Sequence, residues 1–336
     1  MSTDRRWDLL ALGNPCADLV VDVASPPRAG EKVLGRLRGR FAGGTTANAA
    51  CALARLGGRA AVMGQVGDDD AGRQLRAAFE TDGVDARHLA TLPGRSTGLA
   101  IAMRPTGGDA ALVVIPLIAE AMSETTLRAA LSMSRVVLAT PSDLTELRRL
   151  RQLAAETGTL VAIDIDPVVA ADRGAVLARA ALADIVLLNA RALHGTGKGT
   201  AAHDTPDDAL RALQDLRAAL PSPPLLMAAT RGARGAGAID ATAEIAEIAS
   251  EDTIVKMADE SGFPRDAVDT TGAGDTFNGA LILAWLEGQP LREALRFACA
   301  AASLAVGAVG ARTAMPDREA TQRLAASDDA GPAPAT

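Results

Sequence analysis

The sequence predicts an α/β protein with a central, mostly parallel sheet that helices cover on both faces. From about residue 135 onward, short apolar segments of strand character alternate with helical segments. The apolar segments are continuous runs, which is typical of parallel strands buried on both faces. Two early stretches, about 18–41 and about 97–116, break this alternation. They predict antiparallel strands outside the main sheet.

Each element follows from its own pattern of apolar, turn and capping residues. Strands are predicted at Leu9–Gly13, Asp18–Val23, Ala60–Val66, Thr97–Met103, Ala110–Pro116, Arg135–Thr140, Thr159–Ile165, Asp184–Asn189 and Leu225–Thr230. Helices are predicted at Thr46–Leu56, Ala71–Thr81, Asp143–Glu156, Ala175–Leu182, Pro206–Ala219 and Thr276–Glu287. The run Thr106-Gly107-Gly108-Asp109 predicts a hairpin turn between two of the early strands.

Composition limits the classes of protein that fit. A chain of 336 residues with 48% hydrophobic residues can form one large domain or two small ones, and its 2% aromatic content predicts a core of Ala, Leu and Val. The formal charge of −7 disfavours a general nucleic-acid binder. The start, Met1–Val23, lacks a signal-peptide pattern because Asp8, Asn14 and Asp18 interrupt its apolar stretches.

The longest apolar run near the end, Phe297–Ala311, is 15 residues long and is too short for a membrane span, so a buried helix is expected there. The three cysteines are widely spaced and form no metal pattern, which favours a reducing cytoplasm.

The most informative stretch is Asp269–Ala280, with the sequence DTTGAGDTFNGA. It predicts a glycine-rich turn that feeds into a helix, and the unpaired N–H groups of a helix N-terminus favour an anionic ligand. Asp275 would stand beside that anion, where it could take the proton of a hydroxyl that attacks a phosphoryl group. The alternative is that Asp275 only caps the helix.

A second glycine-rich motif, Gly43–Ala50 with the sequence GGTTANAA, lies far upstream and is followed by Gly64–Asp69. Together the two motifs resemble the signatures of the ribokinase-like carbohydrate kinases, the PfkB family. The resemblance extends from about Leu9 to Pro316.

The resemblance implies a ribokinase-like three-layer α/β/α fold with a small β lid built from about 18–41 and 97–116. It implies a single kinase domain over 1–326 and a disordered tail over 327–336. It also implies an ATP-dependent sugar kinase that uses Mg²⁺, with K⁺ bound beside the anion hole, and a homodimer formed through the lid. The substrate would be a small sugar or sugar acid, with no nucleic-acid or membrane partner, and the protein would be cytoplasmic.

By the same resemblance each motif residue has an expected role. Asp275 would be the general base, and Gly272, Ala273 and Gly274 would form the anion hole. The substrate hydroxyls would be held by Asp18, Gly43, Gly44 and Asn48. The nucleotide would lie along Asn189, Thr230, Gly232 and Gly235, and Asp269 would bind potassium. The alternative roles are structural. Asp18 would cap a turn, and Asn48 would hydrogen-bond to the backbone in the first turn of its own helix. Thr230 to Gly235 would form a plain turn, and Asp269 would only brace the Thr270-Thr271 turn.

One departure from the family pattern concerns magnesium. The family has Asn-x-x-Glu where this chain has Asn189 followed by Ala192. The missing carboxylate puts magnesium binding in doubt, and Asp164 or Asp166 at the neighbouring strand end could replace it. Ala192 therefore leaves open a sugar-binding homologue with weakened catalysis. A nucleoside kinase of the same fold is a second alternative, because Gly13-Asn14-Pro15 resembles that branch of the family.

The residues Arg36, Arg38 and Arg40 are spaced by two and are predicted to project from one face of a strand. They would form a solvated lid face or, if that face turns to the cleft, hold the phosphate of a phosphosugar.

Overall fold

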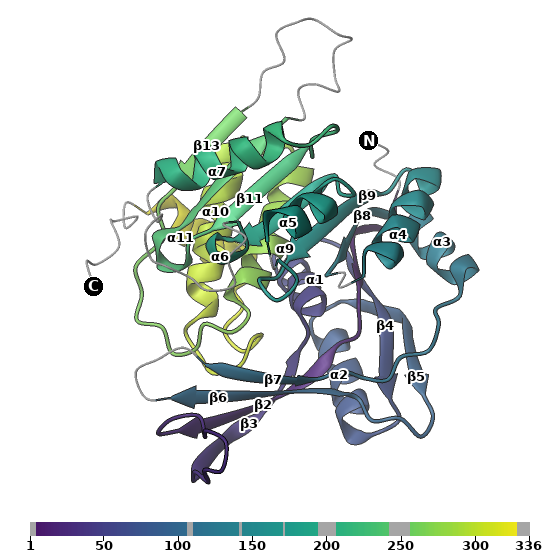
Figure 1. The fold of residues 1–336 in the computed structure, drawn as a ribbon, viewed down its shortest axis with the longest axis vertical. Coiled ribbons are helices and arrows are strands. Elements are labelled where there is room, and N and C mark those ends of the chain that lie inside the picture. The colour runs from purple at the N-terminus through teal and green to yellow at the C-terminus, as the bar shows by residue number, and fades with distance from the viewer. Residues whose placement is uncertain are drawn as a thin grey trace, which may run out of the picture.

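The computed structural model describes residues 5–105, 110–140, 143–170, 172–193, 206–241 and 256–327. Within these ranges the centre is a nine-stranded sheet in the order β13-β12-β11-β10-β9-β8-β1-β4-β5 (Figure 1). Pairing is parallel from β5 to β11, and β12 and β13 add an antiparallel edge. The predicted mostly parallel sheet is confirmed. The strands are β1 (Trp7–Leu12), β4 (Ala60–Gly67), β5 (Asp85–Leu92), β8 (Ser134–Ala139), β9 (Leu160–Ile165), β10 (Ile185–Asn189), β11 (Leu226–Thr230), β12 (Ala236–Asp240) and β13 (Lys256–Glu260).

Helices cover the sheet on both faces and complete three layers. One face packs against α1 (Thr45–Arg55), α2 (Asp70–Thr81), α9 (Ala273–Leu286) and α10 (Leu291–Ala305), with α11 (Arg318–Ala326) against α10. The other packs against α3 (Glu124–Ser132), α4 (Leu144–Thr157), α5 (Arg173–Ala180), α6 (Ala190–Leu193) and α7 (Pro206–Ala218). In β1, Leu9 points into the first core and Leu10 into the second. This two-sided burial explains why the strands are apolar without interruption.

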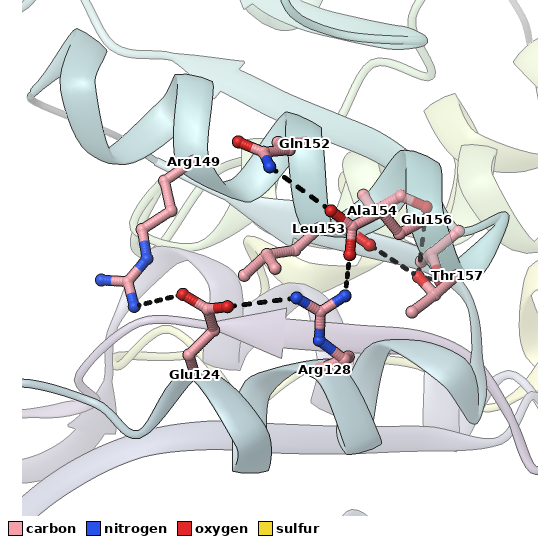
Figure 2. Close-up of polar contacts among 9 residues, drawn as sticks. Glu124, Arg128, Arg149, Gln152, Leu153, Ala154, Glu156 and Thr157 are labelled. Carbon is pink, nitrogen blue, oxygen red and sulfur yellow. Dashed lines mark hydrogen bonds and ion pairs between the residues drawn. The ribbon is translucent and has the colours of Figure 1, made fainter.

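The outer helices α3 and α4 are joined by ion pairs at the surface (Figure 2). Glu124 accepts from Arg128 at 3.1 Å and from Arg149 at 2.9 Å, and Arg128 also pairs with Glu156. Because these side chains are exposed, each pair contributes little to stability. The buried leucines of α4, which include Leu147 and Leu150, hold this layer in place.

A second sheet of four strands, which we call the lid, lies at the bottom of the view in Figure 1. Its order is β3-β2-β6-β7, with β2 at Cys16–Val23, β3 at Gly35–Gly43, β6 at Gly98–Pro105 and β7 at Ala111–Ile115. The pairs β2–β3 and β6–β7 are antiparallel as predicted, but β2 and β6 pair in parallel. The long connection through α1, β4, α2 and β5 makes that parallel pairing possible. The predicted turn at 106–109 and the tail at 328–336 lie outside the described residues.

The expectation that three arginines share one face of β3 is wrong. A register shift opposite Val20 and Val21 places Arg36 opposite Asp22 and Arg40 opposite Leu19. Since Asp22 and Leu19 project to opposite faces of β2, Arg36 and Arg40 do too. Arg38 pairs with Asp22 at 3.4 Å, and none of the three arginines lines the cavity described below.

Two helix boundaries also differ from the sequence prediction. The helix α9 begins at Ala273 instead of Thr276, so the glycine-rich motif itself forms its first turn. The apolar run at 297–311 is not one helix, because α10 already ends at Ala305 and turns follow. Gly310, with φ +95°, takes a conformation that continues no helix.

Among the described residues, no helix is long and apolar enough to cross a bilayer. The thiols of Cys16, Cys51 and Cys299 are all free.

We predict that Gly279→Ala destabilises the protein through the contact between α1 and α9. A Cβ at this position would lie 2.3 Å from the backbone oxygen of Ala49, so one helix must shift, at a cost of about 1–3 kcal/mol. Urea unfolding should show the loss. As a control, Gly174→Ala in α5 meets only the Asp172 side chain, at 3.1 Å, and should be near neutral. An unchanged midpoint for Gly279→Ala would contradict this prediction.

Candidate active site

A cavity of about 1400 Å³ lies where the sheet, the lid and the N-termini of α1 and α9 meet. Its walls include the carboxyl ends of β9, β10 and β11, which is where ligands bind in open α/β sheets. The structure brings most of the predicted residues to this cavity. These are Asp18, Gly44, Asn48, Asn189, Thr230, Gly232, Gly235, Gly272, Ala273, Gly274 and Asp275.

The first turn of α9 presents backbone N–H groups to the cavity. Gly272 caps the helix with φ 82°, and a Cβ there would lie 2.6 Å from the oxygen of Ala311, so the position requires glycine. The Ala273 N–H donates to the oxygen of Thr270 at 3.2 Å. The N–H groups of Gly274 and Asp275 have no acceptor among the described residues. The turn thus offers open donors and the positive end of the helix dipole to an anion.

Asp275 is half-buried in this turn, and its Oδ2 accepts from Asn48 Nδ2 at 2.7 Å. Burial raises the pKa of Asp275 to about 6. Repulsion from Asp18 and Asp166 adds to this rise, while the Asn48 hydrogen bond and the charge of Arg312 oppose it. At neutral pH the carboxylate is therefore ionised, yet more basic than an ordinary aspartate.

Asn48 itself is buried and belongs to α1, 227 residues away from Asp275 in the chain. Its Oδ1 accepts from Arg312 Nε at 2.7 Å, and Arg312 Nη2 donates to the oxygen of Gly43 at 2.9 Å. No motif in the sequence singled out Arg312. Its position directly after Gly310-Ala311, in a stretch that resembles the family, was the only available signal.

Asp18 projects from β2 of the lid into the cavity and is only 7% exposed. Burial raises its pKa, and Asp269 adds to the rise, whereas Cys16 and Arg312 oppose it. Gly43 lies so close that a Cβ would be 2.2 Å from Asp18 Oδ1. Gly43 thus leaves room for the carboxylate without lining the cavity itself.

Asp269 braces the glycine-rich turn. Its Oδ1 accepts from the Thr271 N–H at 3.0 Å, and its Oδ2 accepts from the Gly310 N–H at 2.9 Å. Arg104 Nη1 lies 3.9 Å away, and Asp269 is buried outside the cavity lining. These contacts match the bracing role, which is the alternative to potassium binding.

On the opposite side, Thr230 ends β11 and a short 3₁₀ helix, η1 (Gly232–Arg234), follows. Arg231 is buried and pairs with Asp259 at 2.6 Å, which anchors the turn. Asn189 ends β10, and its Oδ1 accepts from the Ala192 N–H at 2.9 Å. Ala192 is fully buried and does not line the cavity.

Two further carboxylates, Asp164 and Asp166, line the cavity beside Asp275. Burial raises the pKa of Asp164 to about 8, and repulsion from Asp275 and Asp166 adds to the rise, although a hydrogen bond with Asn278 opposes it. No described group of three or more His, Cys, Asp or Glu side chains has the geometry of a metal site. A cation that brings its own phosphate ligands needs only one or two protein carboxylates, however, and it would relieve this repulsion.

Comparison with known proteins gives a consistent family. The sequence model of the pfkB family carbohydrate kinases matches residues 8–318. The chain is 30% identical over 324 residues to the ribokinase of Haemophilus influenzae, covering 94% of this chain and 97% of that protein. It is 26% identical over 329 residues to the nucleoside kinase of Methanothermobacter thermautotrophicus, with 97% of each chain covered.

Among solved structures, Arabidopsis thaliana ribokinase complexed with ribose and ATP aligns with a TM-score of 0.75 and 25% identity. This alignment covers 96% of the present chain and 99% of that one. The predicted ribokinase-like architecture is confirmed by this likeness.

We predict that Asp275→Asn stabilises the fold at neutral pH. The folded-state pKa of about 6 lies above the ordinary value of 3.8. The protonated carboxyl therefore contributes its full stabilisation of the fold below about pH 4, and this stabilisation is lost as the pH rises through 6. The substitution should raise the free energy of unfolding by about 1–3 kcal/mol at pH 7.5 and by little at pH 4.

Thermal and urea unfolding at both pH values would test this prediction. Asp69→Asn is the control of opposite sign, because hydrogen bonds from Thr97 and Gly72 outweigh burial and lower the pKa of Asp69. It should destabilise the fold at pH 7.5. A destabilised Asp275→Asn at that pH would refute the prediction.

Proposed function

Because the chain belongs to the pfkB family of carbohydrate kinases, we propose that it transfers the γ-phosphate of ATP to a hydroxymethyl group of a small neutral sugar. The observation that carries the proposal is the placement of Asp275. A carboxylate with a raised pKa lies in a helix turn whose N–H groups face a cavity. Such a pairing of base and anion site suits the transfer of a phosphoryl group to a hydroxyl.

In this proposal Asp275 accepts the proton of the substrate hydroxyl as that oxygen attacks the phosphorus. A well-placed base contributes about 10²–10⁴ in rate. The open N–H groups in the first turn of α9 stabilise the negative charge that develops on the transferred group. Loss of one preorganised donor of this kind costs roughly 3–4 kcal/mol.

The substrate end of the cavity favours a neutral polyol. Asp18 and Asn48 offer hydrogen-bonding groups there, and the lid contributes apolar side chains. Among the described lining residues, the basic ones are Arg191, Arg231, Arg234 and Arg265, and the first three lie in or beside the segments proposed to hold ATP. A phosphosugar or sugar acid would bring a second negative charge beside the Asp18 carboxylate, and Arg312, whose charge lowers the pKa of Asp18, lies outside the cavity lining. A carboxylate can accept from two neighbouring hydroxyls, as a sugar diol requires.

ATP would lie along Asn189, Thr230, Gly232 and Gly235, with its phosphates toward the N-terminus of α9. The donor set of Asp164 and Asp166 fits magnesium, because a divalent cation would relieve the repulsion among the three carboxylates. Bound magnesium would neutralise charge on the phosphate oxygens. Asp164 and Asp166 would take the place of the glutamate that the family has at the position of Ala192. Potassium beside Asp269 stays a prediction.

A nucleoside kinase is the second candidate, because the archaeal relative carries that name. Purine sites favour aromatic stacking. The lid side of this cavity instead presents the aliphatic residues Val20, Ala100, Ala102, Leu112 and Val114. A sugar-binding homologue with weakened catalysis is the third candidate, and it is suggested by Ala192 at the position of the family glutamate.

We predict substrate-dependent ADP release with a neutral sugar in the presence of ATP, Mg²⁺ and K⁺. Asp275→Asn should lower kcat about 10²–10⁴-fold. For the native protein, kcat/KM should fall as pH drops through about 6, because protonated Asp275 cannot accept a proton. A coupled assay over neutral sugars, phosphosugars, sugar acids and nucleosides would measure this.

Asp82→Asn, remote from the cavity, serves as a control, and replacing K⁺ by Na⁺ tests the potassium prediction. Turnover of nucleosides alone would establish the second candidate. Sugar binding by calorimetry without turnover would establish the third.

We also propose a homodimer that forms through the outer face of the lid. Val113 pairs with Ile101, and Leu37 with Val21, on the side away from Asp18. Val113 is 46% exposed and Leu37 is 60% exposed. An exposed apolar sheet face of this kind is a common interface.

Val113→Asp should shift the protein from dimer to monomer in sedimentation velocity, because it would bury a charge in the contact. Met257→Asp, an equally exposed position at the far edge of the main sheet, should leave the oligomeric state unchanged. A native monomer at micromolar concentration would contradict the proposed dimer.

A further inference from the structure

Arg312 is a buried cation whose described acceptors carry no charge. Its residue is only 5% exposed, and its guanidinium lies 4.9 Å from the centre of the fully buried Phe79 ring. No carboxylate among the described residues lies within ion-pair distance of it. Its described hydrogen-bond acceptors are the neutral oxygens of Asn48 and Gly43. Burying a guanidinium in this way is unfavourable, so we expect Arg312 to have a role that offsets the cost.

The hydrogen-bond donors of Arg312 fix the orientation of the Asn48 side-chain amide. Arginine donates hydrogen bonds and accepts none, so the atom of Asn48 that faces Arg312 Nε at 2.7 Å must be the oxygen. The amide nitrogen then faces Asp275 Oδ2, also at 2.7 Å, where an ionised carboxylate needs a donor. If the amide turned over, its NH₂ group would meet Arg312 and its oxygen would meet Asp275. Both contacts would then be repulsive.

The same guanidinium also holds the chain that leads into α1. Its Nη2 donates to the oxygen of Gly43, two residues before that helix begins. Two donors on one rigid, planar group thus fix both the backbone that leads into α1 and the rotamer of Asn48. A lysine keeps the charge but cannot reproduce this fork.

We propose that Arg312 is a positioning residue for phosphoryl transfer, which acts through Asn48 by holding its amide in the one orientation that donates to Asp275. This inference rests on the proposed function for its kinetic consequence. Its structural part, the orientation of the amide, stands independently of any turnover.

The kinetic test is a double-mutant cycle of Arg312→Gln and Asn48→Ala in the full-length protein, with kcat and KM measured on the substrate found in the panel. Arg312→Gln should lower kcat roughly 10–100-fold, as expected for a misplaced base, and should change KM far less. In the Asn48→Ala background the effect of Arg312→Gln on kcat should shrink to less than about 3-fold. Arg312→Lys should not restore kcat.

The matched control is Arg55→Gln. Arg55 Nη1 donates to the backbone oxygen of Arg312 at 2.7 Å and to that of Met315 at 3.1 Å, so it supports the same segment without touching Asn48. It should lower the thermal midpoint with kcat unchanged. Equal losses of kcat in Arg55→Gln and Arg312→Gln, or full additivity in the cycle, would overturn the proposal in favour of a merely structural role.

A readout independent of turnover is the side-chain amide signal of Asn48 in ¹⁵N–¹H correlation spectra, assigned by its loss in Asn48→Ala. In the ligand-free native protein it should be displaced downfield, and it should move toward the ordinary amide position in Arg312→Gln and Arg312→Lys. An unmoved signal in both folded variants would refute the proposal. A displaced native signal without kinase activity would leave the amide orientation intact and count against the proposed function instead.

Discussion

The site depends on the close packing of α1 against α9. Gly279 lets the two helices approach until a single added methyl group would reach the backbone of Ala49. At this spacing the first turns of both helices open onto the same cavity, and Asn48 reaches Asp275. Two glycine-rich motifs that lie 227 residues apart along the chain thereby become one site. Helix packing, more than either loop, sets the distance between the candidate base and the candidate substrate-binding residues.

The electrostatics of the cavity lower the stability of the fold and make its carboxylates more basic. Asp18, Asp164 and Asp275 all have raised pKa values, chiefly because each is withdrawn from water. Their mutual repulsion is a cost that an ordinary core would not tolerate. The guanidinium of Arg312 and the open N–H groups of α9 reduce the cost without removing it. Such unrelieved charge is typical of sites that bind a cation and an anion together.

The absence of the usual glutamate at Ala192 has a local structural counterpart. Asn189 uses its Oδ1 to hold the Ala192 N–H, and the alanine side chain is buried against the second core. The carboxylates at this part of the cavity come instead from the end of β9 and the residue that follows it, where Asp164 and Asp166 stand. The parallel pairing of β9 with β10 brings these carboxylates alongside Asn189, which is why the proposed function gives them the acidic role of the missing glutamate.

Local patterns in the sequence were enough to predict the mostly parallel sheet, most of the helices and the two hairpins of the lid. Apolar runs, caps and glycine-rich turns are short-range signals, and the site motifs are contiguous. The parallel pairing of β2 with β6 depends on contact between distant segments, whereas the bulge that separates Arg36 from Arg40 and the antiparallel edge at β12 and β13 depend on strand registers that no apolar run specifies.

The role of Arg312 shows the division between sequence and tertiary structure most clearly. By itself the sequence determined that a carboxylate follows a glycine-rich turn at a helix start, since helix caps and their open N–H groups are local properties. Only the tertiary structure decided which amide faces that carboxylate and which buried cation orients the amide. Those contacts join residues more than 200 positions apart, and no periodicity or spacing along the chain encodes them.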